Sequence, residues 1–133
     1  MNKGNEAVVR RLYDEGWNLG QFDVVGDCLT DEYFCHDVPE GLNRGIEQTK
    51  RMMATYSSVF DKLHWTIDDM VSDGDRVVVR GTLEGNHVAD FMGSKPTGKR
   101  VTMKTIDIFR VANEKVVEHW GAMSMTSMAQ FFM

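Results

Sequence analysis

An alternating pattern between Val101 and Val111 constrains the fold more than any other feature of the chain. Its odd positions are mostly apolar and include Asp107, whereas polar residues dominate its even positions. Because successive side chains of a strand point to opposite faces, the odd positions are predicted to face the core. Burying the Asp107 carboxylate without partners is expensive, so this residue needs a structural or a functional reason to be there.

A second strand is predicted at 115–121, after a tight turn that reverses the chain. With a three-residue loop, the hairpin places Asp107 opposite His119 and Phe109 opposite Val117. A change of one residue in this register would send His119 to the other face of the sheet. The Asp107–His119 pair is therefore the starting point for a candidate active site.

The composition indicates a globular chain with the length of one ordinary domain, and we expect a single domain over 1–133. The formal net charge is −5, so the chain lacks the excess of basic residues that nucleic-acid binding requires. No apolar run approaches the ~20 residues that span a bilayer, and Met1 to Arg10 has no signal-peptide core. We therefore expect a cytoplasmic protein without nucleic-acid or membrane partners. The four histidines lack the spacing of metal ligands, so no metal site is expected.

The order of the expected elements indicates an α+β fold. Hydrophobic spacing and turn signals predict helices at 5–18, 22–29 and 46–60, strands at 32–37, 63–71 and 76–84, the hairpin, and a short final helix at 123–133. One strongly curved, mostly antiparallel sheet wrapped around the three N-terminal helices would bury every apolar face. Such a sheet encloses a cavity, the concave apolar site that a small ligand requires.

The residues expected to line this cavity are mainly aromatic. Those on the helices and on the inward face of the hairpin are Tyr13, Trp17, Tyr56, Phe60, Met103 and Phe109. Core filling is the plainer interpretation of such residues, but some would face a flat apolar ligand. His36 follows Cys35 on a short strand, so only one of the two can point inward. His87, at the end of a valine-rich strand, is a candidate for the pocket mouth, although a histidine at a loop edge is commonly solvated.

The opposite face of the hairpin is also apolar, with Ile106, Ile108 and Trp120 on even positions. An exposed apolar sheet face is typical of a subunit interface. We therefore expect a homodimer that pairs through the outer face of the sheet.

Several segments resemble one known family. The stretch from Val8 to Asn18, the loop from Gly93 to Val101, and the hairpin strands Ile106 to Val111 and Lys115 to Trp120 are similar to SnoaL-like proteins. These proteins form the polyketide-cyclase-like branch of the nuclear transport factor 2-like superfamily. The resemblance implies a cone-shaped α+β barrel, a deep pocket and, frequently, a homodimer.

The resemblance also implies a chemistry. Characterised cyclases of the family close a ring by an intramolecular aldol reaction, without a metal or an organic cofactor. Their acid/base aspartate lies two positions after a histidine that corresponds to His119, and Gly121 occupies that position here. A second polar position of the family, on the preceding strand, holds Asp107. The carboxylate has either moved to Asp107 or the cyclase chemistry has been lost.

Asp107 and His119 are predicted to be the catalytic residues. Asp107 could orient His119 as a general base, or Asp107 could itself accept a proton while His119 polarises a carbonyl group. Both hypotheses fit a cyclase, isomerase or hydrolase that acts on an apolar, carbonyl-containing small molecule. The alternatives are a structural Asp–His pair and a non-catalytic ligand-binding or assembly domain, which Gly121 favours.

Overall fold

Helices form the first part of the chain, as their hydrophobic spacing predicts. The computed structural model describes residues 2–131. Its helical segments are α1 (Lys3–Arg11), the π-helix η1 (Leu12–Trp17), the 3₁₀-helix η2 (Phe22–Val24), α2 (Val25–Cys28), α3 (Gly45–Val59) and, after the sheet, α4 (Met125–Ala129). The helix begins earlier than the predicted residue 5, because Asn2 caps α1: its Oδ1 accepts a hydrogen bond from the Asn5 N–H at 3.1 Å. Within 2–131, no helix has the length and apolarity needed to cross a membrane.

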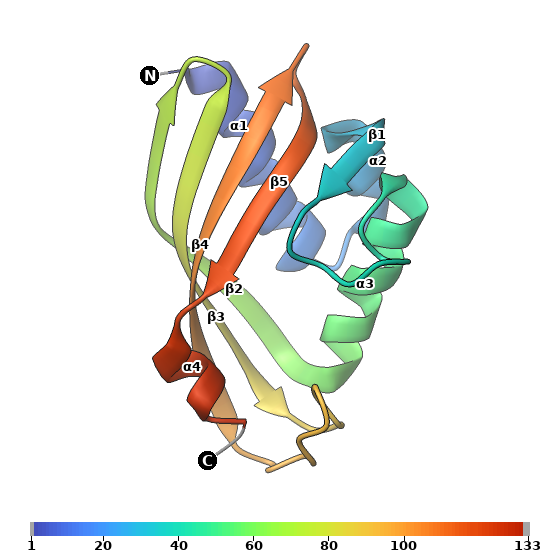
Figure 1. The fold of residues 1–133 in the computed structure, drawn as a ribbon, viewed down its shortest axis with the longest axis vertical. Helices are drawn as coiled ribbons and strands as arrows, with labels where there is room; N and C mark the ends of the chain where they lie inside the picture. The colour runs from blue at the N-terminus through green and yellow to red at the C-terminus, as the bar shows by residue number, and fades with distance from the viewer. Residues whose placement is uncertain (1, 132–133) are drawn as a thin grey trace.

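Five strands form one curved sheet that wraps around α1 and α3 (Figure 1). They are β1 (Leu29–Cys35), β2 (Phe60–Asp73), β3 (Arg76–His87), β4 (Arg100–Ala112) and β5 (Lys115–Met123). Their order is β1-β5-β4-β3-β2, with β1 parallel to β5 and all other pairs antiparallel. The predicted α+β cone is therefore confirmed. The strands β2 and β3 are longer than predicted, and the backbone at Lys62 has φ +53°, within a register shift that bends β2.

The turn between β4 and β5 differs from the prediction. Ala112 pairs with Lys115, so the loop contains only Asn113 and Glu114. Both have positive φ values, 51° and 63°, as a type I′ hairpin turn requires. A three-residue loop had been expected because Ala112 continues no recognisable strand pattern on its own.

The predicted register of the hairpin is therefore wrong, but its faces are right. An irregularity between Arg110 and Val111 adds a second one-residue shift to that of the turn. As a result, His119 lies opposite Phe109, and Asp107 lies opposite Gly121. Two shifts of one residue restore the alternation, so His119 still points to the same side as Asp107.

The inner face of β4 confirms the predicted burial pattern. Every odd position is buried: Val101, Met103, Thr105, Asp107, Phe109 and Val111. The even positions are exposed or half-buried, and Ile106 retains 54 % of its accessible surface. Asp107 thus stands inside the apolar core.

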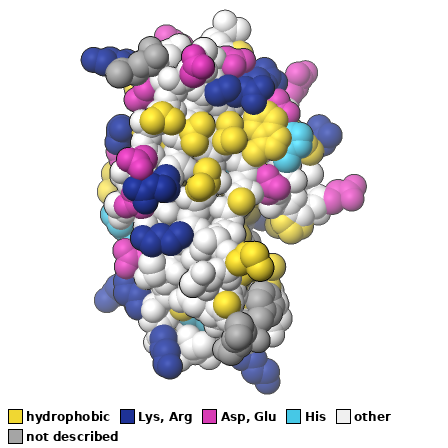
Figure 2. Space-filling model, turned by 60° about the vertical axis from the view of Figure 1, so that its left-hand side comes forward, with side chains coloured by type: hydrophobic (Ala, Val, Ile, Leu, Met, Phe, Trp, Pro, Cys, Tyr) yellow, Lys and Arg dark blue, Asp and Glu magenta, His cyan; other side chains and the backbone are white. Residues whose placement is uncertain are grey.

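An apolar row crosses the outer face of the sheet. The register aligns Val71 with Val78, Val78 with Ile108, and Ile108 with Trp120. Figure 2 shows hydrophobic side chains gathered in a band across this face. At the end of the row, the imidazole of His36 stacks on Trp120 with ring centroids 4.8 Å apart.

Candidate active site

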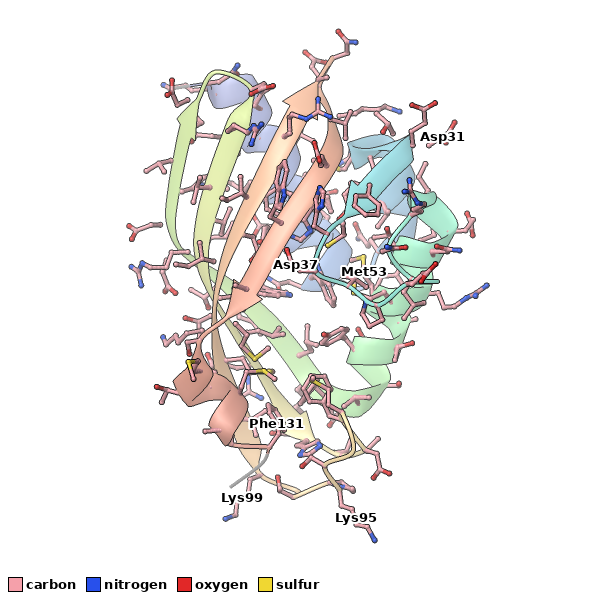
Figure 3. All side chains as sticks on the ribbon, viewed as in Figure 1. Asp31, Asp37, Met53, Lys95, Lys99 and Phe131 are labelled. Carbon is pink, nitrogen blue, oxygen red and sulfur yellow. The ribbon has the colours of Figure 1, made fainter. Side chains whose placement is uncertain are left out.

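A cavity of about 200 Å³ lies between the inner face of the sheet and the helices. A dry apolar cavity of about 150 Å³ takes up benzene, so this one has room for a ring-sized ligand. Figure 3 shows Asp37 and Met53 between the sheet and α3, whereas Lys95 and Lys99 point away from the molecule at one end. The acidic, basic, thiol and phenol groups on the cavity wall are Tyr13, Tyr33, Cys35, Asp37, Tyr56, Asp107 and His119.

Asp107 has a hydrogen-bond partner on each carboxylate oxygen. Its Oδ1 lies 2.8 Å from Nε2 of His119, and its Oδ2 accepts a hydrogen bond from the hydroxyl of Tyr13 at 3.2 Å. Only 7 % of Asp107 is exposed, so these partners replace most of its hydration. The predicted contact between Asp107 and His119 is present, although it is a diagonal contact rather than one between directly opposed residues.

The stacking of two rings orients His119 toward Asp107. Its imidazole lies parallel to the ring of Phe109, with centroids 4.3 Å apart and an interplanar angle of 8°. Directly opposed side chains in a sheet are close enough for such a stack, and diagonal neighbours remain within reach of long side chains. Phe109 therefore holds the imidazole plane while Nε2 reaches across to Asp107.

The second nitrogen of the imidazole faces β1. Nδ1 of His119 lies 3.0 Å from the hydroxyl of Tyr33 and 3.4 Å from Sγ of Cys35. Cys35 and His119 are paired residues of the parallel strands β1 and β5, which places them side by side. The Asp107 carboxylate can only accept, so Nε2 of His119 carries a hydrogen in both protonation states.

Charge and burial act in opposite directions on His119. Burial alone lowers the pKa of His119, but the hydrogen bond to Asp107, followed by that to Cys35, raises it from 6.5 to about 9. His119 is therefore cationic at neutral pH and forms a buried ion pair with Asp107. Burial, reinforced by the charge of Asp107, raises the pKa of Tyr13 well above 10, so Tyr13 remains a hydrogen-bond donor.

Gly121 makes room for the Asp107 carboxylate. A Cβ at position 121 would lie 2.5 Å from Oδ1 of Asp107 and 3.4 Å from Nε2 of His119. Carbon atoms do not approach oxygen this closely, so any side chain at position 121 would displace Asp107. The carboxylate of Asp107 on β4 thus occupies the space that a side chain at position 121 would need.

A π-helix brings Tyr13 and Trp17 to the cavity. The N–H of Asn18 bonds to the carbonyl oxygen of Tyr13, five residues earlier, at 3.0 Å. Such segments are rare and frequently occur at functional sites. Tyr13 packs edge-on against Trp65 at 5.2 Å, and Trp17 packs against Tyr56 at 6.0 Å.

Half of the predicted ligand-binding residues line the cavity. Tyr13, Trp17, Tyr56 and Phe109 do so. Phe60 and Met103 are fully buried in the core behind the cavity wall, so their placement on the wall was wrong.

The two histidines predicted near the pocket lie elsewhere. Cys35 is the residue that points inward, and His36 binds Glu118 on the outer face at 2.6 Å. His87 is fully buried between Phe60 and Phe131, with ring centroids 5.6 and 5.4 Å away, and does not reach the pocket mouth. Strand β3 extends to His87, so the loop that was expected to expose it begins later.

Several residues of the site were not predicted. Tyr33 and Cys35 lie on one face of the predicted strand 32–37, but Phe34 on the other face is also apolar, so alternation alone did not identify the inward face. Asp37 accepts a hydrogen bond from the N–H of Gly121 at 2.8 Å, a contact that depends on the pairing of β1 with β5. Within residues 2–131, Nε1 of Trp65 and Oγ1 of Thr105 are buried without hydrogen-bond partners, and both residues line the cavity.

No group of three or more metal-ligating side chains converges among residues 2–131. The site consists of an ion pair, three phenols, a second carboxylate, a thiol and a mostly apolar wall. These groups can transfer protons and donate hydrogen bonds.

Comparisons with known proteins agree on one family. Solved structures with the same fold include TsrD of Streptomyces laurentii, with 25 % identity, a TM-score of 0.87, and coverage of 98 % of this chain and 96 % of that one. A protein of Jannaschia sp. CCS1 classed as a SnoaL-like polyketide cyclase has 27 % identity and a TM-score of 0.83, over 97 % and 91 % of the two chains. IdmH of Streptomyces antibioticus, classed as a polyketide cyclase, has 25 % identity and a TM-score of 0.80, over 96 % and 97 %.

The sequence itself matches a family model as well. No curated protein matches the chain. The model of the SnoaL-like polyketide cyclases, however, matches residues 7–131, which include every residue of the site. The chain therefore belongs to the SnoaL-like polyketide cyclase family.

Proposed function

We propose that the protein catalyses proton transfer at a carbon next to a carbonyl group, in a cyclisation or an isomerisation that needs no cofactor. The observation that carries the proposal is the Asp107–His119 ion pair, 2.8 Å between Oδ1 and Nε2, on the wall of an apolar cavity. Buried acid/base pairs of this kind cluster at active sites. The substrate would be a small apolar ring compound with at least one carbonyl group.

Asp107 is the better candidate for the base. His119 is cationic at neutral pH because its pKa is about 9, so most of it cannot accept a proton. A carboxylate has about four lone-pair positions, and Asp107 uses one on each oxygen for His119 and Tyr13. The remaining positions can accept the substrate proton, while the C–H electron pair moves into an enolate.

Two buried groups would donate hydrogen bonds to the carbonyl oxygen of the substrate. Nε1 of Trp65 and Oγ1 of Thr105 have no partner within 2–131, and a buried polar group without a partner gains most from a ligand. Thr105 lies two positions before Asp107 on the same face of β4, ~7 Å along the strand. A carbonyl oxygen at Thr105 would therefore leave the adjacent carbon within reach of Asp107.

The test uses 2-tetralone, a fused two-ring ketone with acidic α-hydrogens. In D₂O at neutral pH, NMR should show that the protein accelerates exchange of these hydrogens. We expect Asp107→Asn to lower this acceleration by roughly 10²–10⁴-fold, the usual contribution of a positioned base. Circular dichroism and quenching of tryptophan fluorescence by 2-tetralone should show that the variant folds and binds.

A matched control is Asp73→Asn, at an exposed carboxylate at the far end of β2. It should leave the exchange rate unchanged. Equal acceleration by Asp107→Asn and the wild type would remove Asp107 from the mechanism. Binding of 2-tetralone without any exchange would instead favour the non-catalytic binding protein that Gly121 suggested.

A further inference from the structure

A thiol, an imidazole and a carboxylate form a continuous chain of contacts on the cavity wall. Sγ of Cys35 lies 3.4 Å from Nδ1 of His119, and Nε2 of the same ring lies 2.8 Å from Oδ1 of Asp107. All three residues line the cavity. The thiol is thus placed on the same imidazole that the proposed acid/base chemistry uses, from the opposite side of the ring.

Three neighbouring strands supply one member each. Cys35 ends β1, His119 is its paired residue on β5, and Asp107 lies diagonally across on β4. The strand order β1-β5-β4 places the imidazole between the sulfur and the carboxylate. A nucleophile, a base, and a third group that orients the base are the parts of a catalytic triad.

The polarity of the contacts fits this order. Asp107 can only accept a hydrogen bond, so Nε2 of His119 carries a hydrogen in both protonation states. In the neutral imidazole, which becomes abundant as the pH approaches 9, Nδ1 is free and is the position that takes up a proton from the thiol. The hydroxyl of Tyr33, 3.0 Å from Nδ1, shares this position. Burial raises the pKa of Tyr33 well above 10, so Tyr33 keeps its proton and can donate to an oxyanion.

We infer that Cys35 is a nucleophile, activated by His119 and Asp107, that accepts the acyl group of an ester or thioester. The thiol proton passes to Nδ1 of a neutral His119, and a bond forms between Sγ and the acyl carbon. The bond from that carbon to the leaving alcohol or thiol then breaks, and the leaving group takes the proton from Nδ1. Water attacks the resulting thioester by the reverse sequence, releasing a carboxylic acid and restoring the thiol.

This activity goes beyond the proposed enolisation, because it forms a covalent intermediate at a residue that enolisation does not use. The two reactions also have separate readouts, an acetyl group on Cys35 for acyl transfer and deuterium exchange of 2-tetralone for enolisation. The two proposals can therefore fail independently of each other.

The second cysteine of the chain is an internal control. Cys28 is 1 % exposed, does not line the cavity, and has a pKa raised by burial. A reaction directed by the site should therefore modify Cys35 and leave Cys28 unmodified. The variant Cys28→Ser provides a background with one thiol.

The experiment uses 4-nitrophenyl acetate as the acyl donor at pH 9, where about half of His119 is neutral. In the Cys28→Ser background we expect a burst of one equivalent of 4-nitrophenolate, and mass spectrometry should find one acetyl group on Cys35. His119→Gln keeps a donor for Asp107 but has no basic nitrogen, and should slow acetylation by roughly 10²-fold. Cys35→Ser should abolish the burst, and circular dichroism should show that both variants fold.

Two results would overturn the inference. One is the absence of an acetyl group on Cys35 in a folded protein. The other is equal acetylation rates with His119 and with Gln at position 119, which would show that the thiol reacts without help from the imidazole.

Discussion

At the scale of the residue, the site depends on hydrogen bonds between buried side chains, which replace the water that each polar group loses on burial. Asp107 is stable inside an apolar core because His119 and Tyr13 each occupy one of its oxygens. The absence of a side chain at Gly121 is equally necessary, since a Cβ there would meet Oδ1 of Asp107 at 2.5 Å. Position 121 thus has no side chain, and the carboxylate at this point of the cavity wall comes from the adjacent strand β4.

The titration of His119 predicts a loss of stability in alkaline solution. Its pKa is about 9 in the folded protein and near 6.5 when unfolded, so the folded state binds the proton more tightly. The resulting stabilisation is fully present below pH 6.5 and disappears as the pH rises through 9. Its size is on the order of 3 kcal/mol at 1.36 kcal/mol per pKa unit.

Urea unfolding at pH 6 and pH 9.5 measures this effect. The difference in the free energy of unfolding between the wild type and His119→Gln should shrink by about that amount over the interval. A difference that stays constant would show that His119 has the same pKa in both states.

At the scale of the element, one turn decides how the two strands of the site meet. The two-residue loop of Asn113 and Glu114 requires positive φ at both positions, and glutamate adopts φ +63° only at a cost. Together with the irregularity at Arg110 and Val111, this turn sets Phe109 against His119. The stacked rings, and through them the orientation of the imidazole, follow from the turn.

Replacing Glu114 should therefore stabilise the protein if the replacement is glycine. Glu114→Gly removes the steric penalty of the left-handed backbone, and we expect a gain of about 1 kcal/mol in the free energy of unfolding. Glu114→Ala removes the same charge but keeps a Cβ, and should give no gain. Equal effects of the two substitutions in urea unfolding would assign the change to charge rather than to backbone conformation.

At the scale of the whole molecule, the cone has two apolar surfaces with different roles. The inner face of the sheet packs on the helices and encloses the cavity. The outer face carries the row from Val71 to Trp120, and Ile106, 54 % exposed, lies on the same side. Apolar patches of this kind on a soluble protein mark interaction sites.

We propose that a second copy of the chain covers the outer face. Sedimentation velocity should show a dimer at micromolar concentration, and Ile106→Lys should shift it toward the monomer because it places a charge in the interface. Val88→Lys is the matched control, an equally exposed apolar residue beyond the end of β3. A monomeric wild type, or an equal effect of both substitutions, would contradict a dimer through this face.

The amino-acid sequence by itself determined the fold class, the family, and the side of the sheet on which Asp107 and His119 lie. Alternation along a strand is a local property. The predicted faces are right because the turn and the irregularity at Arg110 and Val111 each shift the register by one residue, and a shift of two residues leaves every side chain on its predicted face. The sequence also indicated that only one of Cys35 and His36 could face inward. It did not indicate which, because Tyr33 and Phe34 are adjacent and both aromatic, so neither face of the strand stands out as the apolar one.

Only the tertiary structure decided the contacts between residues far apart in the chain. The pairing of Cys35 with His119, the π-helix that brings Tyr13 to Asp107, and the burial of His87 under Phe131 depend on how separate elements pack. Register and packing are set by hydrogen bonds and contacts across the sheet, which leave no periodic signal in the sequence. The acidic group within the core and the histidine on the neighbouring strand could therefore be predicted from the sequence, but Tyr13, which reaches Asp107 from η1, could not.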